Sequence, residues 1–218
     1  MQMPAALIAL ALITPVLAEE VRGSGRVVEQ QRPVTDFQSI RSDGVWILDV
    51  KVGPAPSVKV KADDNLQPLI ETVVQNKQLH IRFKDGKQTV HLKDDSKLRI
   101  EVTVPKLTAY SHEGAGKTIF HDINSEQFSL EYEGAGLVTA TGRVGKLSVQ
   151  ASGAGALDLD ALKARDVSVS LEGVGAISVY ASESLTAAVD GIGSLTYYGK
   201  PAKVSKTVSG IGSVSAGN

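Results

Sequence analysis

Six copies of the tripeptide Gly-x-Gly recur through the second half of this chain at nearly equal intervals. The first glycines of successive copies are separated by 20, 19, 20, 18 and 19 residues, a regularity typical of a stacked repeat architecture. Glycine suits a recurring corner because it adopts backbone angles that other residues avoid and lets neighbouring coils approach closely. We therefore interpret these glycines as structural corner residues. They are Gly114, Gly116, Gly134, Gly136, Gly153, Gly155, Gly173, Gly175, Gly191, Gly193, Gly210 and Gly212.

Apolar residues alternate with other residues on both sides of each corner. Before Gly173, for example, Val167, Val169 and Leu171 occupy every second position. This period of two predicts a strand with one face in a core. Short strands cannot bury that face alone, but strands stacked ~4.8 Å apart share one core. The expected fold is therefore all-β, with a parallel β-helix-like solenoid of about six Gly-x-Gly coils over residues 106–218.

The residue between the two glycines is apolar in every copy and becomes larger along the chain. Because it is apolar, we expect it to point into the core at the corner. In the last coil Lys206 stands where other coils have an apolar residue. A charge is costly inside a stack, so we expect Lys206 to cap the open end. The residues between the glycines are Ala115, Ala135, Ala154, Val174, Ile192 and Ile211.

The region before the solenoid, residues 19–105, shows short strand patterns separated by turn signals. One stretch, Leu66–Gln75, is expected to form a helix that Asp64 or Asn65 caps. We therefore predict an antiparallel β-layer with one short helix, packed beside the solenoid and covering one end of it. The expected strands are Val27–Gln31, Trp46–Val52, Val58–Ala62, Gln78–Phe83, Thr89–Leu92 and Leu98–Val104.

The first 18 residues, MQMPAALIALALITPVLA, are uncharged and mostly apolar. Val16 and Ala18 occupy the −3 and −1 positions of a cleavage site, so residues 1–18 are interpreted as a signal peptide. The alternative is an uncleaved anchor, because no Lys or Arg precedes the apolar stretch. Either interpretation predicts export to the periplasm, to the outer surface or into the medium, with no transmembrane segment after cleavage.

Three segments resemble one known family: RPVTDFQSIRSDGVWILDV (Arg32–Val50), VKADDNLQPLIETVV (Val60–Val74) and the GAG, GVG and GIG coils. Their order is similar to that in the putative auto-transporter adhesin, head GIN domain family. The resemblance spans about Gly25 to Ser215. It implies a secreted or envelope-associated β-helix-like protein without an established reaction. It supplies no catalytic residues, because the shared motif consists of structural glycines.

Carboxylates precede several corner glycines and are expected to face outward along one edge of the stack. One interpretation is a weak Ca²⁺-binding or glycan-binding stripe, because hard cations take several carboxylate oxygens. The other is a solvated acidic edge that keeps the β-stack soluble. The candidate ligand-binding residues are Glu113, Glu131, Glu133, Asp158, Glu172 and Asp190, with Ser152 and Ser209 continuing the ladder.

Several function classes are excluded or disfavoured. The chain has no cysteine, which rules out disulfides and thiolate chemistry. Its net charge is −1, with 23 basic and 24 acidic residues, so no excess positive charge favours nucleic-acid binding. No catalytic residues, metal site or cofactor are expected apart from weak Ca²⁺ binding, since His80, His91, His112 and His121 lack ligand spacing.

These observations favour a non-catalytic, adhesin-like or structural envelope protein whose partner is an envelope protein or a glycan. The alternative is a carbohydrate-active enzyme, a glycosidase or lyase, that uses Glu113, Glu131 and Glu133. An enzyme predicts a groove where these carboxylates meet exposed aromatic side chains, whereas a binding module predicts a smooth flank. The uncovered last coil also predicts homo-oligomers formed through the C-terminal end.

Overall fold

The computed structural model describes residues 20–84, 89–91 and 98–218, so the expected signal peptide lies outside the described residues. The described chain is all-β, as predicted, and its one helical element is a 3-10 turn. The strands are β1 (Glu20–Arg22), β2 (Val27–Arg32), β3 (Ser39–Val52), β4 (Ser57–Asp63), β5 (Ile70–Gln75), β6 (Gln78–Phe83), β7 (Thr89–His91), β8 (Arg99–Val104), β9 (Ala109–Tyr198) and β10 (Lys203–Ala216).

A mixed, mostly parallel sheet joins eight of these strands in the order β10-β9-β3-β8-β4-β2, with β6 beside β3 and β5 beside β6, and β1 pairs with β7 in a separate two-stranded sheet. The layer predicted to be antiparallel is so at three pairs: β2 with β4, β4 with β8 and β5 with β6. The exceptions are β1, which runs parallel to β7, and β3, which runs parallel to β6, β8 and β9. Thus β3 forms the junction between the antiparallel strands and the repeats.

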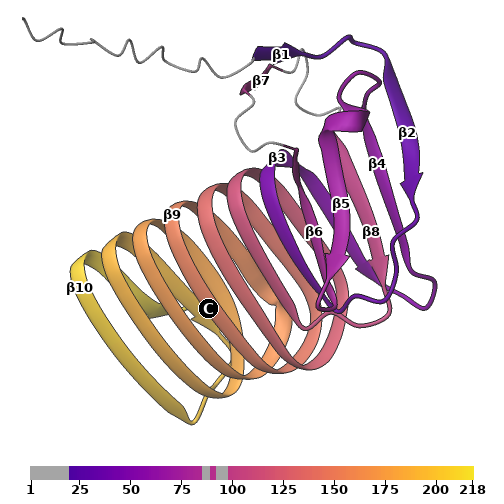
Figure 1. The fold of residues 1–218 in the computed structure, drawn as a ribbon. Helices are drawn as coiled ribbons and strands as arrows, with labels where there is room; N and C mark the ends of the chain where they lie inside the picture. The colour runs from indigo at the N-terminus through magenta and orange to yellow at the C-terminus, as the bar shows by residue number, and fades with distance from the viewer. Residues whose placement is uncertain (1–19, 85–88, 92–97) are drawn as a thin grey trace, which may run out of the picture.

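The repeats form one continuous β-segment, β9, which is 90 residues long and is drawn in Figure 1 as successive stacked coils. We use "coil" for the stretch between one Gly-x-Gly and the next. At one end of the stack β10 pairs in parallel with the last part of β9 over 14 residues, from Lys203 to Ala216. At the other end β3 pairs with the first part of β9, which places Trp46 in register with Gly116. Trp46 lies in the region that we expected to precede the repeats, yet its strand, β3, stacks directly on the first coil.

The corner glycines stack directly on one another, and each leaves no room for a side chain. A Cβ atom added to Gly134 would overlap the Gly114 carbonyl oxygen and lie 3.0 Å from the Gly114 nitrogen. The backbone of Gly134 also has a φ of 146°, a conformation that residues with a Cβ rarely adopt. Close contact and backbone angle together therefore require glycine at this corner.

The residue between the glycines points outward, so our expectation that it enters the core is wrong. Val174, Ile192 and Ile211 are 53%, 55% and 77% exposed. The reason is that the two-residue period continues through the corner: Leu171 faces inward, so both glycines of Gly173-Val174-Gly175 take inward positions and the middle residue faces outward. We call this line the corner ridge; it comprises Val45, Ala115, Ala135, Ala154, Val174, Ile192 and Ile211.

The inward positions of all these strands form one continuous hydrophobic core that extends from Phe37 to Leu195. Burial of each Val, Leu or Ile side chain contributes roughly 1.5–3 kcal/mol. Past Leu195 the core ends at β10, where Val204 and Val208 are 41% and 44% exposed. Lys206 lies across this end as expected: its ammonium group donates to the Val214 carbonyl at 3.1 Å and lies 4.7 Å from the Tyr197 ring centroid.

The helix expected over Leu66–Gln75 is not formed. A 3-10 turn covers Gln67–Leu69, and the residues after it form β5, antiparallel to β6. Ile70, Thr72, Val73 and Val74 are β-branched, and such residues favour strands. The turn also lacks a side-chain cap.

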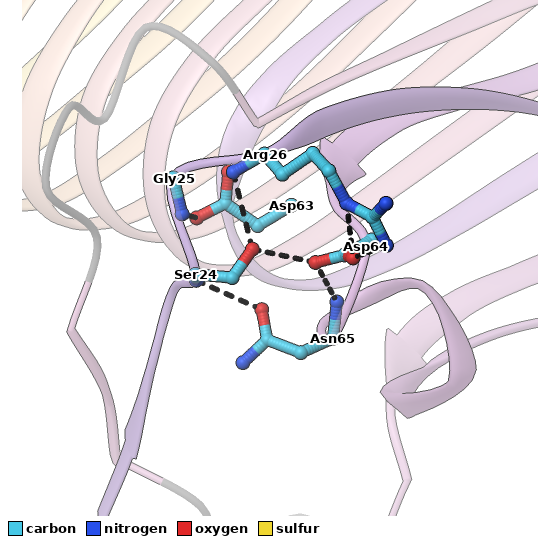
Figure 2. Close-up of polar contacts among 6 residues, drawn as sticks. All are labelled: Ser24, Gly25, Arg26, Asp63, Asp64 and Asn65. Atoms are coloured by element: carbon cyan, nitrogen blue, oxygen red, sulfur yellow. Dashed lines mark hydrogen bonds and ion pairs between the residues drawn. The ribbon is translucent and has the colours of Figure 1, made fainter.

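The residues expected to cap that helix instead tie down the chain before β2 (Figure 2). The Ser24 hydroxyl donates to Asp64 at 2.5 Å, and its backbone nitrogen donates to the Asn65 side chain at 3.0 Å. The Gly25 nitrogen donates to Asp63 at 3.0 Å. Side chains that can cap a helix can equally satisfy backbone groups of a neighbouring loop. Asp63, Asp64 and Asn65 therefore hold the segment before β2 against the end of β4.

Replacing Gly134 with alanine should lower the free energy of unfolding by more than about 2 kcal/mol, because a strained φ and a backbone overlap add. The measurement is urea unfolding followed by circular dichroism. Gly53→Ala is the matched control: its added Cβ would meet only the Thr103 methyl group, at 3.3 Å. An equal loss in both variants would contradict the stacking argument.

Candidate functional site

The carboxylates predicted to face outward do so, and four of them line one open groove on the surface of β9. Glu113, Glu131, Glu133 and Glu172 are all exposed and lie around a hollow of about 370 Å³. They occupy the first and third positions before a corner glycine, which alternation directs away from the core. The groove crosses adjacent coils, so residues about 20 apart in sequence become neighbours. We call it the acidic groove; Ser111, Gln150, Ser152 and Ser170 complete its polar lining.

Arg41 closes the N-terminal end of the acidic groove. Its Nε donates to Asp43 Oδ2 at 3.0 Å, and its Nη2 lies 3.3 Å from Glu113 Oε2. The hydrogen bond and the charge of Asp43 raise the pKa of Arg41, and Glu113 and Glu131 add to this effect. The groove therefore offers a fixed cation at one end and carboxylates along its length.

Arg41 was not predicted as a site residue, although the sequence carries a signal for it. β3 pairs with β9 so that Asp43 lies opposite Glu113 and Gly44 opposite Gly114. Gly44-Val45-Trp46 is thus a corner in which tryptophan replaces the second glycine. Aligning that tripeptide with the repeats would have placed Arg41 beside Ser111.

Two of the six predicted carboxylates do not line the acidic groove. Asp158 lies beyond the corner, where the Ser178 hydroxyl donates to it at 2.8 Å. Asp190 is exposed farther along the ladder, in register with Ser209 of β10. The predicted ladder therefore divides into a grouped set near the N-terminal coils and isolated carboxylates beyond.

Buried polar rings lie beneath the acidic groove. Tyr110, His112 and Tyr132 are stacked, with centroid separations of 6.2 Å and 5.2 Å. His112 Nδ1 is 2.9 Å from the Ser42 carbonyl oxygen, so the ring donates its Nδ1 proton there. Burial lowers the pKa of His112 and raises that of Tyr132. Of these rings, His112 and Tyr132 belong to the lining of the acidic groove.

The acidic groove lacks the aromatic platform that we expect of a carbohydrate-active enzyme. Tyr132, an aromatic residue of its lining, is only 4% exposed. The groove itself departs from the smooth flank expected of a binding module. The structure therefore combines one feature of each hypothesis: grouped carboxylates in a hollow, and no exposed ring against which a sugar could stack.

No group of three or more His, Cys, Asp or Glu residues within the described part of the chain is arranged to hold a metal ion. Two histidines contribute to other interactions: His112 binds Ser42, and His121 Nε2 lies 3.2 Å from Asp49 Oδ1. Among the residues that the structure covers, there is also no helix with the length and apolar character needed to cross a membrane.

A family model for the putative auto-transporter adhesin, head GIN domain, matches residues 36–201. The chain belongs to this family. The match includes β3, all of β9 and the acidic groove, and it confirms the resemblance seen in the sequence. No curated protein matches the chain.

Solved structures share this fold at low sequence identity. A putative adhesin from Bacteroides fragilis is 22% identical, with a TM-score of 0.71, over 90% of this chain and 99% of that one. A putative lipid binding protein from Parabacteroides distasonis is 20% identical, with a TM-score of 0.55, over 92% of this chain and 100% of that one. Both likenesses concern the fold alone.

The free energy of unfolding should fall as the pH drops below about 6.5, the pKa of His112 in the unfolded chain. Burial lowers the folded-state pKa of His112, so in this window the unfolded chain binds more protons than the folded one. The contribution is fully present above the unfolded pKa and is lost on acidification.

Urea midpoints measured at pH 7.5 and 5.5 test this expectation. The decrease should be smaller in His112→Gln than in the unaltered protein. His80→Gln, which changes a half-buried histidine on β6, is the control and should retain the decrease. Equal pH dependence in both variants would show that His112 does not contribute.

Proposed function

We propose that this protein is a non-catalytic, exported, adhesin-like module of the cell envelope, built on a parallel β-solenoid whose acidic groove binds a glycan. The repeats support the solenoid: β3, β9 and β10 are in parallel register, and their glycines stack at one corner. Family membership supports the adhesin-like class.

The grouping of Glu113, Glu131, Glu133 and Glu172 around one hollow with Arg41 carries the proposal. Ionised carboxylates accept hydrogen bonds from hydroxyl groups, and the guanidinium of Arg41 donates them. A glycan offers hydroxyl groups that both donate and accept. The polar lining thus fits a sugar held at its edges rather than stacked on a ring.

An open groove with no exposed aromatic floor favours weak binding that several copies of the protein would strengthen through avidity. The groove is open to water, whereas a site for efficient hydrolysis would have to exclude bulk water. These two features favour a binding module over a glycosidase or lyase.

A glycan array probed with the protein lacking residues 1–18, with and without Ca²⁺, tests the proposal. Glu133→Gln should weaken binding by about tenfold, because hydrogen bonds to charged groups are worth roughly 1.5–3 kcal/mol. Glu183→Gln, which removes an equal charge from an exposed site outside the groove, should leave binding unchanged. Release of products would instead identify a carbohydrate-active enzyme, and binding that Glu133→Gln leaves intact would contradict the role of the groove.

The C-terminal coil supports a second property, self-association of two copies through β10. This strand pairs on one side with β9, and Val208 is 44% exposed at its end of the core. An open edge and exposed apolar side chains favour pairing, although Lys206 lies across the same end and opposes it.

Light scattering should show a dimer fraction that rises with protein concentration and decreases in Val208→Glu. A charge at Val208 would have to be buried at the contact. Glu substituted at exposed Ala202, just before β10, is the control. A protein that stays monomeric at millimolar concentration would contradict self-association.

A further inference from the structure

A second groove, with cations in place of carboxylates, crosses β9 away from the corner ridge. It encloses about 690 Å³ and shares no lining residue with the acidic groove. Successive coils contribute Glu126, then Arg143, then Lys163 and Arg165, then Tyr180. These residues come from neighbouring coils, so stacking rather than proximity in sequence brings the cations together. We call this hollow the basic groove.

The cations of the basic groove are not neutralised by carboxylates. Within the described ranges, no carboxylate oxygen of Asp or Glu lies within 4.0 Å, the limit for a salt bridge, of a side-chain nitrogen of Arg143, Lys163 or Arg165. Arg143 and Arg165 are exposed. With Glu126 included, the formal charge of the lining is two positive. Cations that line a hollow without an ion pair attract an anionic group.

Lys163 is held in place without losing its charge. Its Nζ donates to the Asp160 carbonyl oxygen at 2.9 Å and lies 4.0 Å from the centroid of the Tyr180 ring. Both interactions stabilise an ammonium group, and neither supplies a full negative charge. A side chain fixed before binding loses less conformational entropy when a ligand arrives. Lys163 is therefore a preorganised cation.

The floor of the basic groove is open because residue 145 is a glycine. A Cβ atom there would lie 2.6 Å from the Glu126 carbonyl oxygen and 3.4 Å from Arg165 Nη2. The Arg165 guanidinium thus extends over the position that a side chain would fill. The Glu126 carboxylate approaches the same point, since its Oε2 would be 3.1 Å from the added atom.

This arrangement selects for more than charge. Glu126 repels a simple anion but accepts hydrogen bonds from hydroxyl groups, and the hydroxyls of Ser125 and Ser182 can donate or accept. A ligand that satisfies the whole lining has an acidic group for the cations and hydroxyl groups for Glu126. We propose that the basic groove binds an acidic saccharide, one whose sugar ring carries a carboxylate or phosphate.

Calorimetric titration with trigalacturonate, which carries a carboxylate on each ring, tests the proposal. Arg143→Gln with Arg165→Gln should weaken binding by about tenfold or more, because charge-assisted hydrogen bonds from two guanidinium groups are lost. The control is Lys61→Gln with Lys117→Gln, which removes the same charge from exposed positions outside the groove and should change binding less than about twofold. Equal weakening in both double variants would show nonspecific attraction and overturn the proposal.

Two further probes separate a saccharide site from a simple anion site. Maltotriose, which has no charge, should not bind, and inorganic phosphate should bind more weakly than trigalacturonate. Glu126→Gln should weaken trigalacturonate binding, since a neutral amide oxygen accepts hydrogen bonds from hydroxyl groups less strongly than a carboxylate does, and should strengthen phosphate binding, since the repulsion is removed. Tighter binding of both probes to Glu126→Gln, or phosphate binding as tightly as trigalacturonate, would overturn the saccharide assignment. So would the absence of any binding. Glu133 lies outside the basic groove. The glycan-array test with Glu133→Gln therefore probes the acidic groove alone, and a negative result there would leave the test of the basic groove unaffected.

Discussion

The close stacking of glycine backbones at one corner is the constraint on which the other features depend. Apart from Gly116, which lies against Trp46, each corner glycine lies against a glycine of the preceding coil, and a Cβ atom at Gly134 would overlap the carbonyl oxygen of that neighbour. Because the corner is this tight, the chain reverses direction without a loop and the strands on both sides keep their register. Register in turn makes each inward position continue one core and each outward position continue one surface line.

The surface lines explain why charges gather on a chain whose overall net charge is near zero. Residues about 20 apart stack as neighbours, so carboxylates before the corner form the acidic groove and cations farther along form the basic groove. The corner ridge presents exposed Val174 and Ile192. Stacked coils thus sort a mixed composition into bands along the surface.

Much of the fold could be predicted because period and alternation are properties of the sequence. The repeat length, the parallel strands and the outward carboxylates followed from them. The direction of the Val174 side chain was predicted wrongly because its apolar character was given more weight than the inward-outward alternation, which continues through the corner. The helix predicted over Leu66–Gln75 does not form, because its β-branched residues and their pairing with β6 outweigh the local signal for a helix cap. Arg41 was missed because Gly44-Val45-Trp46 carries tryptophan at the second glycine position, so this tripeptide was not aligned with the repeats; the register of β3 with β9 makes the correspondence plain.

The end-on arrangement of β10 has a mechanical consequence. A force that pulls the C-terminal coil away along the stack loads the hydrogen bonds between β10 and β9 over the pairs from Lys203 to Ala216. When that coil detaches, the next one takes its place at the end, with a similar contact area and a similar set of bonds. Extension would therefore proceed in steps of one coil at nearly constant force, and each detachment would dissipate a similar amount of energy. Under tension such a stack would absorb a load gradually instead of failing at once.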